Sequence, residues 1–474
     1  MKDHPGTDLK TVHQIANELE ALLGPGVVLV SQNEIDLHTY DAWPVASKWK
    51  MQGKHPCAPD LVVRPHHVGQ IQELVRFAVR EGVPITPWGL GSSVTGACLP
   101  MHGGITLDLS AMKRTLEIDH ANHMVTVEAG ALGSDLEKEV NGHGFTLGNS
   151  PQSLDRSTVG GWLSTRATGQ FSSLYGGIED LVVRFSIVLP SGEILNTPSA
   201  PRYSLGPDLR HIFMGAEGTM GVITQVTLKL FPLPAFRYLE AIRFPSVEAG
   251  IKAIQSIIQS RLHPFLVRLY DEDESSHAMV DPQFHDCVLF LGFEGNHAVA
   301  EAEFAAALEI VQQNGGSVLG PNAVEAWMAR RFDFSTIENR LALTGGVAET
   351  IEVAHFWSGI YPLYRELKQV LAPYAEEVLS HFSHVYPQGT SMYMILLGRQ
   401  SDDAVAEKTI LTVWEKTMAI CKKHHASIAH HHGIGIARLP YLAEELGEGK
   451  VVLGKVKQAL DPEGIMNPGK LGLG

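Results

Sequence analysis

Apolar residues recur at helical and at strand spacing along the first half of the chain. Those from Leu9 to Leu23 follow helical spacing and end at Gly24, which predicts an amphipathic helix, and a short strand at residues 27–30 follows. A strand at 61–64, a helix from residue 68 that ends at Gly82 and a strand at 83–85 predict a β-α-β unit. Short strands at 105–109, 124–129, 181–189 and 221–230 complete one mixed α+β lobe.

Pro232 and Pro234 mark the end of this lobe, because proline cannot continue a sheet ladder. Beyond them, strand 238–244, helix 247–259, strands 265–269 and 287–293 and helix 298–314 predict a split α+β sandwich. The predicted fold class is therefore α+β with two lobes. We divide the chain into an N-terminal helical segment (1–50), a first lobe (51–234), a cap (235–440) and a C-terminal helical tail (441–474) that returns to the first lobe.

Composition and charge narrow the classes of function. The 474 residues are enough for two hydrophobic cores, and the formal net charge of -15 argues against a nucleic-acid partner. The four cysteines are too far apart for a C-x-x-C motif, so we expect reduced thiols in a cytoplasmic protein. The chain has no uninterrupted apolar run of about 18 residues, so we expect neither a signal peptide nor a transmembrane segment. Peripheral contact with a membrane surface stays open.

A glycine-rich loop follows the predicted strand at 83–85. Glycine lacks a Cβ, so backbone amides in such a loop can approach a phosphate closely without a basic side chain. The loop has no lysine after its glycines and does not match a dinucleotide fingerprint, and a purely structural turn is an equal alternative. The residues concerned are Pro87, Trp88, Gly89, Leu90, Gly91, Ser92 and Ser93.

Two further loops favour a cofactor-binding loop over a purely structural turn. The second supplies Gln152, Ser153, Leu154, Asp155, Ser157, Thr158, Gly161, Thr165, Arg166, Ala167 and Thr168, and the third supplies Glu217, Gly218, Gly221, Val222 and Ile223. In order and content the three loops resemble the FAD-binding domain of the vanillyl-alcohol oxidase and p-cresol methylhydroxylase superfamily. The resemblance implies that the first lobe binds FAD: the first loop at the pyrophosphate, the second along the isoalloxazine and ribityl chain, and the third near the adenine and the flavin edge.

We expect the FAD to be bound non-covalently. His66, His67 and His102 lie near the loops in sequence, but a solvent-facing or core position accounts for each of them. None is identified as an attachment residue.

Residues 60–440 resemble, more narrowly, the alkyldihydroxyacetonephosphate synthases, through Gly160 to Ala167, Gly176 to Val183, Gly206 to Asp208 and His430 to Gly435. These enzymes exchange the acyl group of acyl-dihydroxyacetone phosphate for a fatty alcohol. The resemblance implies a flavin that acts as an electrophile at N5, a lipid phosphate substrate and a homodimer.

The same resemblance implies catalytic roles for individual residues. Tyr393 occupies the position of the family's tyrosine acid/base, and nearby cations such as Arg268 must lower its pKa from about 10 for it to act at neutral pH. Arg268 interrupts an apolar strand and needs an anionic partner, either a ligand or one of the carboxylates at 271–274. Arg340 is the candidate for the substrate phosphate, with Arg330 or Arg331 as alternatives.

His430, His431 and His432 follow a predicted strand at 427–429, so we expect them to point to alternating faces. A metal site is one interpretation, but no cysteine or carboxylate stands beside them in sequence. The resemblance implies substrate contact and proton handling instead, so we predict no metal.

The main alternative is an FAD-dependent dehydrogenase of a 2-hydroxy acid or of glycerol 3-phosphate. Such enzymes resemble this chain in the FAD-binding lobe and in the ending Asn467-Pro468-Gly469-Lys470. Their Glu-His-Gly-Ile-Gly motif, however, has its glutamate where this chain has His431. A flavin-binding protein without catalysis would leave Tyr393, Arg268 and the histidines unexplained.

Overall fold

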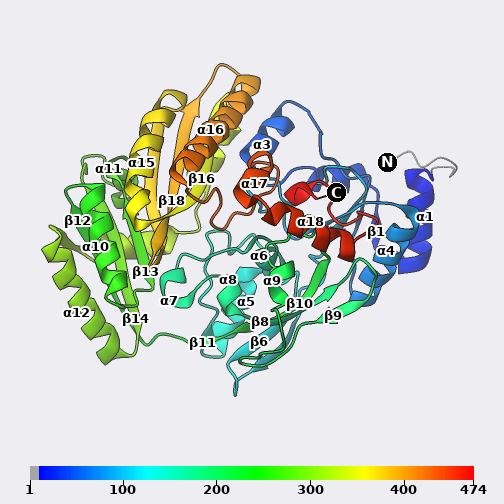
Figure 1. Cartoon of the computed structure of the whole chain (residues 1–474), viewed down its shortest axis with the longest axis horizontal. Helices are drawn as coiled ribbons and strands as arrows, with labels where there is room; N and C mark the ends of the chain where they lie inside the picture. Colours follow the sequence, from blue (N-terminus) through cyan, green and yellow to red (C-terminus); the bar gives the residue numbers. More distant parts are fainter. Residues whose placement is uncertain (1–9, 474) are drawn as a thin grey trace.

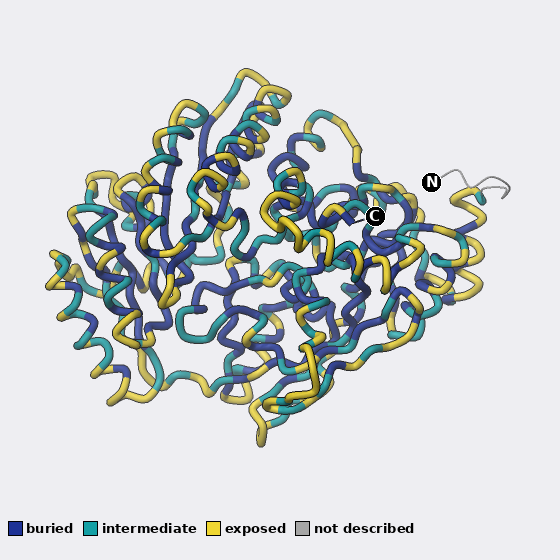
Figure 2. The backbone as a smooth tube through the Cα atoms, viewed as in Figure 1, coloured by how far each residue is buried: buried dark blue, intermediate teal, exposed yellow. Residues whose placement is uncertain are grey.

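The computed structural model describes residues 10–473, which form two lobes (Figure 1). Leu9, the first residue of the predicted N-terminal helix, lies outside the described residues. The buried backbone concentrates in the strands, and exposed backbone follows the outer helices and turns (Figure 2). No helix within residues 10–473 is long and apolar enough to cross a membrane.

The first lobe begins with a small sheet of order β1-β2-β4-β3, in which β4 is parallel to β2 and β3. The β2-α4-β3 unit matches the predicted β-α-β pattern, with β4 inserted between its two strands. Helix α4 buries Ile71, Leu74 and Ala78 and ends at Gly82, whose φ of +64° suits glycine. These elements are α1 (Val12–Leu23), β1 (Val28–Leu29), α2 (Gln32–Leu37), α3 (Pro44–Met51), β2 (Leu61–Val63), α4 (Val68–Glu81), β3 (Ile85–Trp88) and β4 (Ile105–Asp108).

A second, antiparallel sheet of order β5-β6-β10-β8-β9 completes this lobe. On β10, Val226 and Leu228 point into the core beside α6, so Gln225 and Thr227 face the opposite side. The strand predicted at 181–189 is shorter, because Leu181 still belongs to α8. The elements are β5 (Thr115–Asp119), β6 (Met124–Glu128), α5 (Gly133–Gly142), β7 (Phe145–Thr146), α6 (Val159–Thr165), α7 (Ser172–Tyr175), α8 (Ile178–Leu181), β8 (Val182–Val188), β9 (Ile194–Asn196), α9 (Arg210–Phe213), β10 (Val222–Lys229) and β11 (Phe231–Pro232).

The cap contains a seven-stranded antiparallel sheet of order β15-β12-β14-β13-β17-β18-β16. Two β-α-β-β-α series, β12 to α12 and β16 to α16, meet where β13 pairs with β17. The sequence pattern predicted the first series but not the second, nor α11, whose residues are mostly polar. The elements are β12 (Phe236–Phe244), α10 (Val247–Gln259), β13 (Leu266–Tyr270), α11 (Glu272–Met279), β14 (Cys287–Gly295), α12 (His297–Gln313), β15 (Ser317–Gly320), α13 (Asn322–Arg330), α14 (Ser335–Ala342), β16 (Gly346–Phe356), α15 (Trp357–Leu371), the 3-10 helix η1 (Ala372–Tyr374), β17 (Glu377–Tyr386), β18 (Gly389–Arg399) and α16 (Asp403–His424).

Helices α10, α12, α15 and α16 cover one face of the cap sheet, and α16 also contacts α3 of the first lobe (Figure 1). Phe382 and Met392 point into the core under these helices. Because neighbouring residues of a strand alternate, His381 and Tyr393 point to the other face. The strand period therefore directs these two polar side chains toward the first lobe.

The C-terminal segment, red in Figure 1, packs against the first lobe. It consists of α17 (Leu439–Leu446), α18 (Gly449–Leu460) and the 3-10 helix η2 (Lys470–Gly472). Met466 forms a bridge with Ile85 at the edge of the first sheet, and the buried Lys470 Nζ donates a hydrogen bond of 2.6 Å to the Leu99 carbonyl. The C-terminal segment therefore packs on the same lobe as the N-terminal elements.

Candidate active site

The glycine-rich loop offers a run of free backbone donors. Within residues 10–473, the N–H groups of Gly89 to Val94 make no hydrogen bond to the rest of the chain, whereas those of Thr95 and Ala97 bond to Ser93 Oγ. Consecutive free amides form a concavity that suits a phosphate. The Leu90 side chain is 44% exposed, so it does not fill this concavity.

The three loops predicted from the sequence lie against one another. A Cβ added at Gly89 would stand 2.5 Å from Thr158 Oγ1, and one at Gly218 would stand 2.8 Å from Pro87 Cγ. The amide of Glu217 donates to the Ser164 carbonyl at 2.9 Å. Residues 53 to 131 positions apart in the sequence therefore form one surface, and Gly89 and Gly218 have no room for a Cβ there.

Buried polar atoms without partners lie along the second loop and the segment after it. In the part of the chain that the structure describes, the Asn149 carboxamide, Ser150 Oγ, Gln170 Oε1 and Glu179 Oε2 have no hydrogen-bond partner. Leaving such groups unpaired in a protein interior is costly, so they indicate a polar ligand. These four residues are not among the cofactor residues predicted from the sequence.

The other predicted cofactor residues divide into two groups. Leu154, Val222 and Ile223 have side chains in the hydrophobic core, and Gln152 and Asp155 are exposed, with Gln152 bonded to the Asp333 carbonyl. Of the remaining residues, Thr158 caps α6, Thr165 bonds to Gly161 and Arg166 pairs with Glu179. Trp88 lies in a hydrophobic core. The other residues stay predicted contacts of the cofactor: Gly91, Ser92, Ser153, Ser157, Ala167, Thr168 and Gly221.

A cluster of histidines and tyrosines lies where the cap meets the first lobe. Tyr393 Oη lies 2.6 Å from His431 Nε2, His431 Nδ1 lies 2.8 Å from His430 Nδ1, and His430 Nε2 lies 2.7 Å from Tyr386 Oη. His384 stacks on His430 with ring centroids 5.2 Å apart. We call these four residues and His384 the histidine cluster.

The prediction that the three histidines alternate across a strand is wrong. Residues 427–429 form no strand, only an isolated bridge between Ser427 and Ala354. Because the backbone is irregular there, His430, His431 and His432 all come within ring contact of Tyr393 or of one another.

Two buried glutamates hold the loop that carries the histidines. The Glu352 carboxylate accepts the backbone N–H groups of His430 at 2.6 Å and His432 at 3.0 Å, and the Arg438 guanidinium at 2.9 Å. Glu217, from the first lobe, accepts the amides that follow His432, at Ile434 and Gly435. One carboxylate from each lobe therefore fixes this loop.

The surroundings of Tyr393 do not lower its pKa, contrary to the expectation from the sequence. Burial raises the pKa of Tyr393 and the Glu352 carboxylate adds to the rise, while Arg268 and Arg438 oppose it less strongly. Burial also lowers the pKa of His431 well below its usual range. The pair is therefore a neutral phenol beside a neutral imidazole.

Arg268 points from β13 toward this cluster. Its Nε donates to Tyr270 Oη at 2.8 Å, and its guanidinium lies over the Tyr270 and Trp327 rings. Within the described residues no carboxylate lies at ion-pair distance from Arg268; Glu274 bonds to His381 instead. The cation is available for an anionic ligand.

Arg340 lies outside the cluster. It forms an ion pair of 2.9 Å with Glu376, directly before the start of β17. Residue 377 of that strand pairs with Leu397 of β18, whereas residue 381 pairs with Tyr393. Four residues of strand separate these positions, about 13 Å. Of the alternatives, Arg330 bonds to the Ala278 carbonyl, while Arg331 packs on the Phe171 ring with its Nε unpaired.

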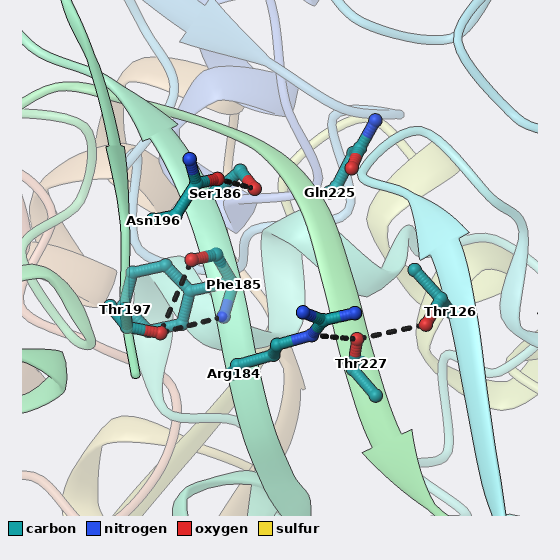
Figure 3. A pocket seen from close by; sticks show the side chains of 8 residues that line it. All are labelled: Thr126, Arg184, Phe185, Ser186, Asn196, Thr197, Gln225 and Thr227. Atoms are coloured by element: carbon teal, nitrogen blue, oxygen red, sulfur yellow. Dashed lines mark hydrogen bonds between the residues drawn. The ribbon is translucent and has the colours of Figure 1, made fainter. Parts of the chain in front are cut away.

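A separate hollow of about 130 Å³ lies on the five-stranded sheet (Figure 3). Arg184, Thr126 and Thr227 line it, on the sheet face opposite the one that packs against α6. It is therefore not part of the candidate site.

Several residues of the site were missed in the sequence. Glu352 and Arg438 stand as charged residues in apolar segments, a signal that could have identified them, because a buried charge needs a partner. Ser172, Tyr386 and His384 carry no such signal, because only the fold brings them to the cluster.

Comparison with known proteins agrees with this geometry. Residues 59–198 match the model of the FAD binding domain, and residues 233–471 match that of the C-terminal domain of FAD linked oxidases. Alkyldihydroxyacetonephosphate synthase of Dictyostelium discoideum is 29% identical over 450 residues, covering 87% of this chain and 73% of the relative. The uncharacterized FAD-linked oxidoreductase YgcU of Escherichia coli strain K12 is 30% identical over 431 residues, covering 87% of this chain and 89% of the relative.

Solved structures give the same fold. An alkyldihydroxyacetonephosphate synthase structure, 26% identical, superposes with a TM-score of 0.81 over 97% of this chain and 85% of that chain. A p-cresol methylhydroxylase structure, 17% identical, superposes with a TM-score of 0.81 over 97% of this chain and 96% of that chain, a likeness of fold alone.

The free amides of the first loop and the orphaned polar atoms of the second fit a cofactor that carries a pyrophosphate and a polar ring system. On these grounds the chain belongs to the FAD-linked oxidase family of the vanillyl-alcohol oxidase and p-cresol methylhydroxylase superfamily and is an FAD-dependent enzyme.

Proposed function

We propose that this enzyme is an alkyldihydroxyacetonephosphate synthase, which exchanges the acyl group of acyl-dihydroxyacetone phosphate for a fatty alcohol. The observation that carries the proposal is the contact of 2.6 Å between Tyr393 Oη and His431 Nε2, a proton donor and acceptor pair facing the FAD-binding lobe. Similarity to named synthases supports the substrate class. FAD would supply an electrophilic ring system, held non-covalently by the three loops.

The protein's own residues would do three things in this reaction. Tyr393 and His431 would take up and return the substrate C1 proton, in the manner of a general acid–base pair. Arg268, which lacks a carboxylate partner, would hold an anionic group of the substrate. For the substrate phosphate, Arg331 is a better candidate than Arg340, because its guanidinium faces Phe171 of the first lobe and Arg340 is engaged by Glu376.

The reaction itself distinguishes this proposal from an FAD-dependent dehydrogenase. Purified holoenzyme given acyl-dihydroxyacetone phosphate and hexadecanol should form the ether product without an external electron acceptor. Anaerobic bleaching of the flavin by D-lactate or glycerol 3-phosphate, with electrons passed to a dye, would instead establish the dehydrogenase.

Substitution of Tyr393 tests the residue that we place at the centre. Tyr393→Phe should keep the protein yellow but lower turnover by on the order of 10²- to 10⁴-fold, because the phenol proton is lost and the ring is kept. Tyr361→Phe, on the outer helix α15, is the matched control and should retain turnover. Unchanged turnover in Tyr393→Phe would remove this residue from the mechanism.

The same similarity supports a homodimer. Sedimentation of the holoenzyme would test this, and a mass near the 51.7 kDa of one chain would contradict it.

A further inference from the structure

A continuous chain of hydrogen bonds leads from Tyr393 to the protein surface. Its steps are Tyr393 Oη to His431 Nε2 (2.6 Å), His431 Nδ1 to His430 Nδ1 (2.8 Å) and His430 Nε2 to Tyr386 Oη (2.7 Å). His431 is 8% exposed, whereas Tyr386 is 37% exposed. Tyr393 and His430 are partly exposed, so Tyr386 is the member of the chain with the greatest access to solvent.

The chain uses both ring nitrogens of each histidine. Since a neutral imidazole carries one N–H and one lone pair, the contact between the two Nδ1 atoms needs a donor on one ring and an acceptor on the other. If His431 holds its proton on Nδ1, then His430 holds its own on Nε2 and donates to Tyr386. Every hydrogen bond then runs from donor to acceptor in the direction from Tyr393 to solvent. With the opposite pair of tautomers, every hydrogen bond runs from solvent to Tyr393.

We propose that Tyr393, His431, His430 and Tyr386 form a proton relay that connects the proposed acid–base tyrosine to solvent. A proton that leaves Tyr393 enters His431 at Nε2 while the Nδ1 proton of His431 passes to His430 Nδ1. The Nε2 proton of His430 then passes to Tyr386, whose own proton goes to water. Each imidazole gains one proton and loses one, so neither imidazole keeps a net charge.

The surroundings of the relay fix its geometry. Glu352 holds the backbone of His430 and His432, and the buried His384 stacks on His430 while its Nδ1 lies 2.8 Å from Ser172 Oγ of the first lobe. Burial lowers the pKa of His430 and of His431, which keeps both rings in the neutral form that the relay needs. The relay would serve the reaction because a substrate bound at Tyr393 would separate that phenol from bulk water.

Tyr386 acts through His430 and not on the substrate, so its test needs readouts specific to proton transfer. Tyr386→Phe keeps the ring and removes the hydroxyl. Turnover should fall about tenfold, less than the 10²- to 10⁴-fold loss of the acid–base group itself. Added imidazole should restore turnover as its concentration rises, and the solvent deuterium isotope effect should increase. Tyr361→Phe should show none of these changes.

The relay rests on the proposed role of Tyr393, and a second measurement separates the two. Nitrogen-15 shifts of selectively labelled histidines in the wild-type holoenzyme, assigned with His430→Gln and His431→Gln, report tautomers without any substrate. We expect two neutral rings of opposite tautomer. Equal tautomers, a charged ring, or wild-type turnover without imidazole dependence in Tyr386→Phe would overturn the relay. Opposite tautomers in an enzyme that makes no ether product would overturn only the substrate.

Discussion

Burial governs the protonation of the histidine cluster and of the neighbouring His432. It lowers the pKa of His384 and His431 well below the usual range, lowers that of His430 and lowers that of His432 to about 4. For His432 the Glu352 carboxylate opposes this effect without overcoming it. Four imidazoles are thus neutral in the folded protein at a pH where they are partly charged in an unfolded chain.

The free energy of unfolding should therefore fall as the pH drops below about 6.5. The unfolded chain then binds protons that the folded cluster rejects, so the stability present above the unfolded pKa is lost by up to about 1.4 kcal/mol per pH unit for each histidine. Urea titrations at pH 7.5, 6.5 and 5.5 measure this slope. His432→Gln should reduce it and His211→Gln, at an exposed site, should not; equal slopes in all three proteins would contradict the account.

At the scale of elements, the loop from Ile428 to Gly435 joins the two lobes. Arg438 donates to the carbonyls of Ile428 and Gly433, and Gly435 crosses the glycine-rich loop so closely that an added Cβ would lie 2.2 Å from the Thr95 carbonyl oxygen. With a φ of +55°, Gly435 also adopts a left-handed conformation. The loop that carries the histidines and the glycine-rich loop thus contact each other directly.

Gly435→Ala should weaken FAD binding as well as folding. The methyl group displaces the Thr95 carbonyl, and strain of this kind costs about 2 kcal/mol. Flavin fluorescence during heating should show release at a lower temperature than in the wild type. Gly454→Ala in α18, where an added Cβ meets nothing within 4 Å, is the control. If both variants release flavin at the wild-type temperature, the contact does not support the cofactor loop.

At the scale of the whole molecule, Asn467 connects the end of the chain to the first and the third cofactor loops. Its buried Nδ2 donates to the Glu217 carbonyl at 2.6 Å and to the Ala97 carbonyl at 3.4 Å, and its Oδ1 accepts from Thr86 at 3.3 Å. Glu217 in turn holds the loop after the histidines. The C-terminal tail therefore holds two of the predicted cofactor loops in position.

Asn467→Ala should lower the urea midpoint and release FAD earlier. It leaves two buried carbonyl groups and a hydroxyl without their partner, a loss of about 3 kcal/mol. Asn122→Ala removes an exposed amide that bonds only within its own turn and should change either quantity little. A wild-type midpoint in Asn467→Ala would show that the tail is not needed to hold the loops.

Local signals in the sequence predicted much of the fold, and the resemblance of three loops to a known family predicted the cofactor. Glycines at Gly89 and Gly218, and the apolar periods of α4, α10 and β12, act over a few residues and leave a pattern that can be recognised. Reliance on such local patterns also explains the wrong prediction of a strand at residues 427–429. Residues 427–429 have the composition of a strand, but their neighbours, not their own propensity, decide their conformation.

The tertiary structure alone decided how the active groups meet. Contacts such as Glu217 to Gly435, Ser172 to His384 and Tyr386 to His430 join residues far apart in the sequence, and their direction depends on how the two lobes pack. Burial, which sets the protonation of Tyr393 and the histidines, is likewise a property of the packed molecule and not of any segment. The sequence thus predicted the cofactor through the order and content of three loops that resemble a known family, because such loops keep a recognisable local pattern; the packing of the lobes determined the path by which a proton can reach Tyr393.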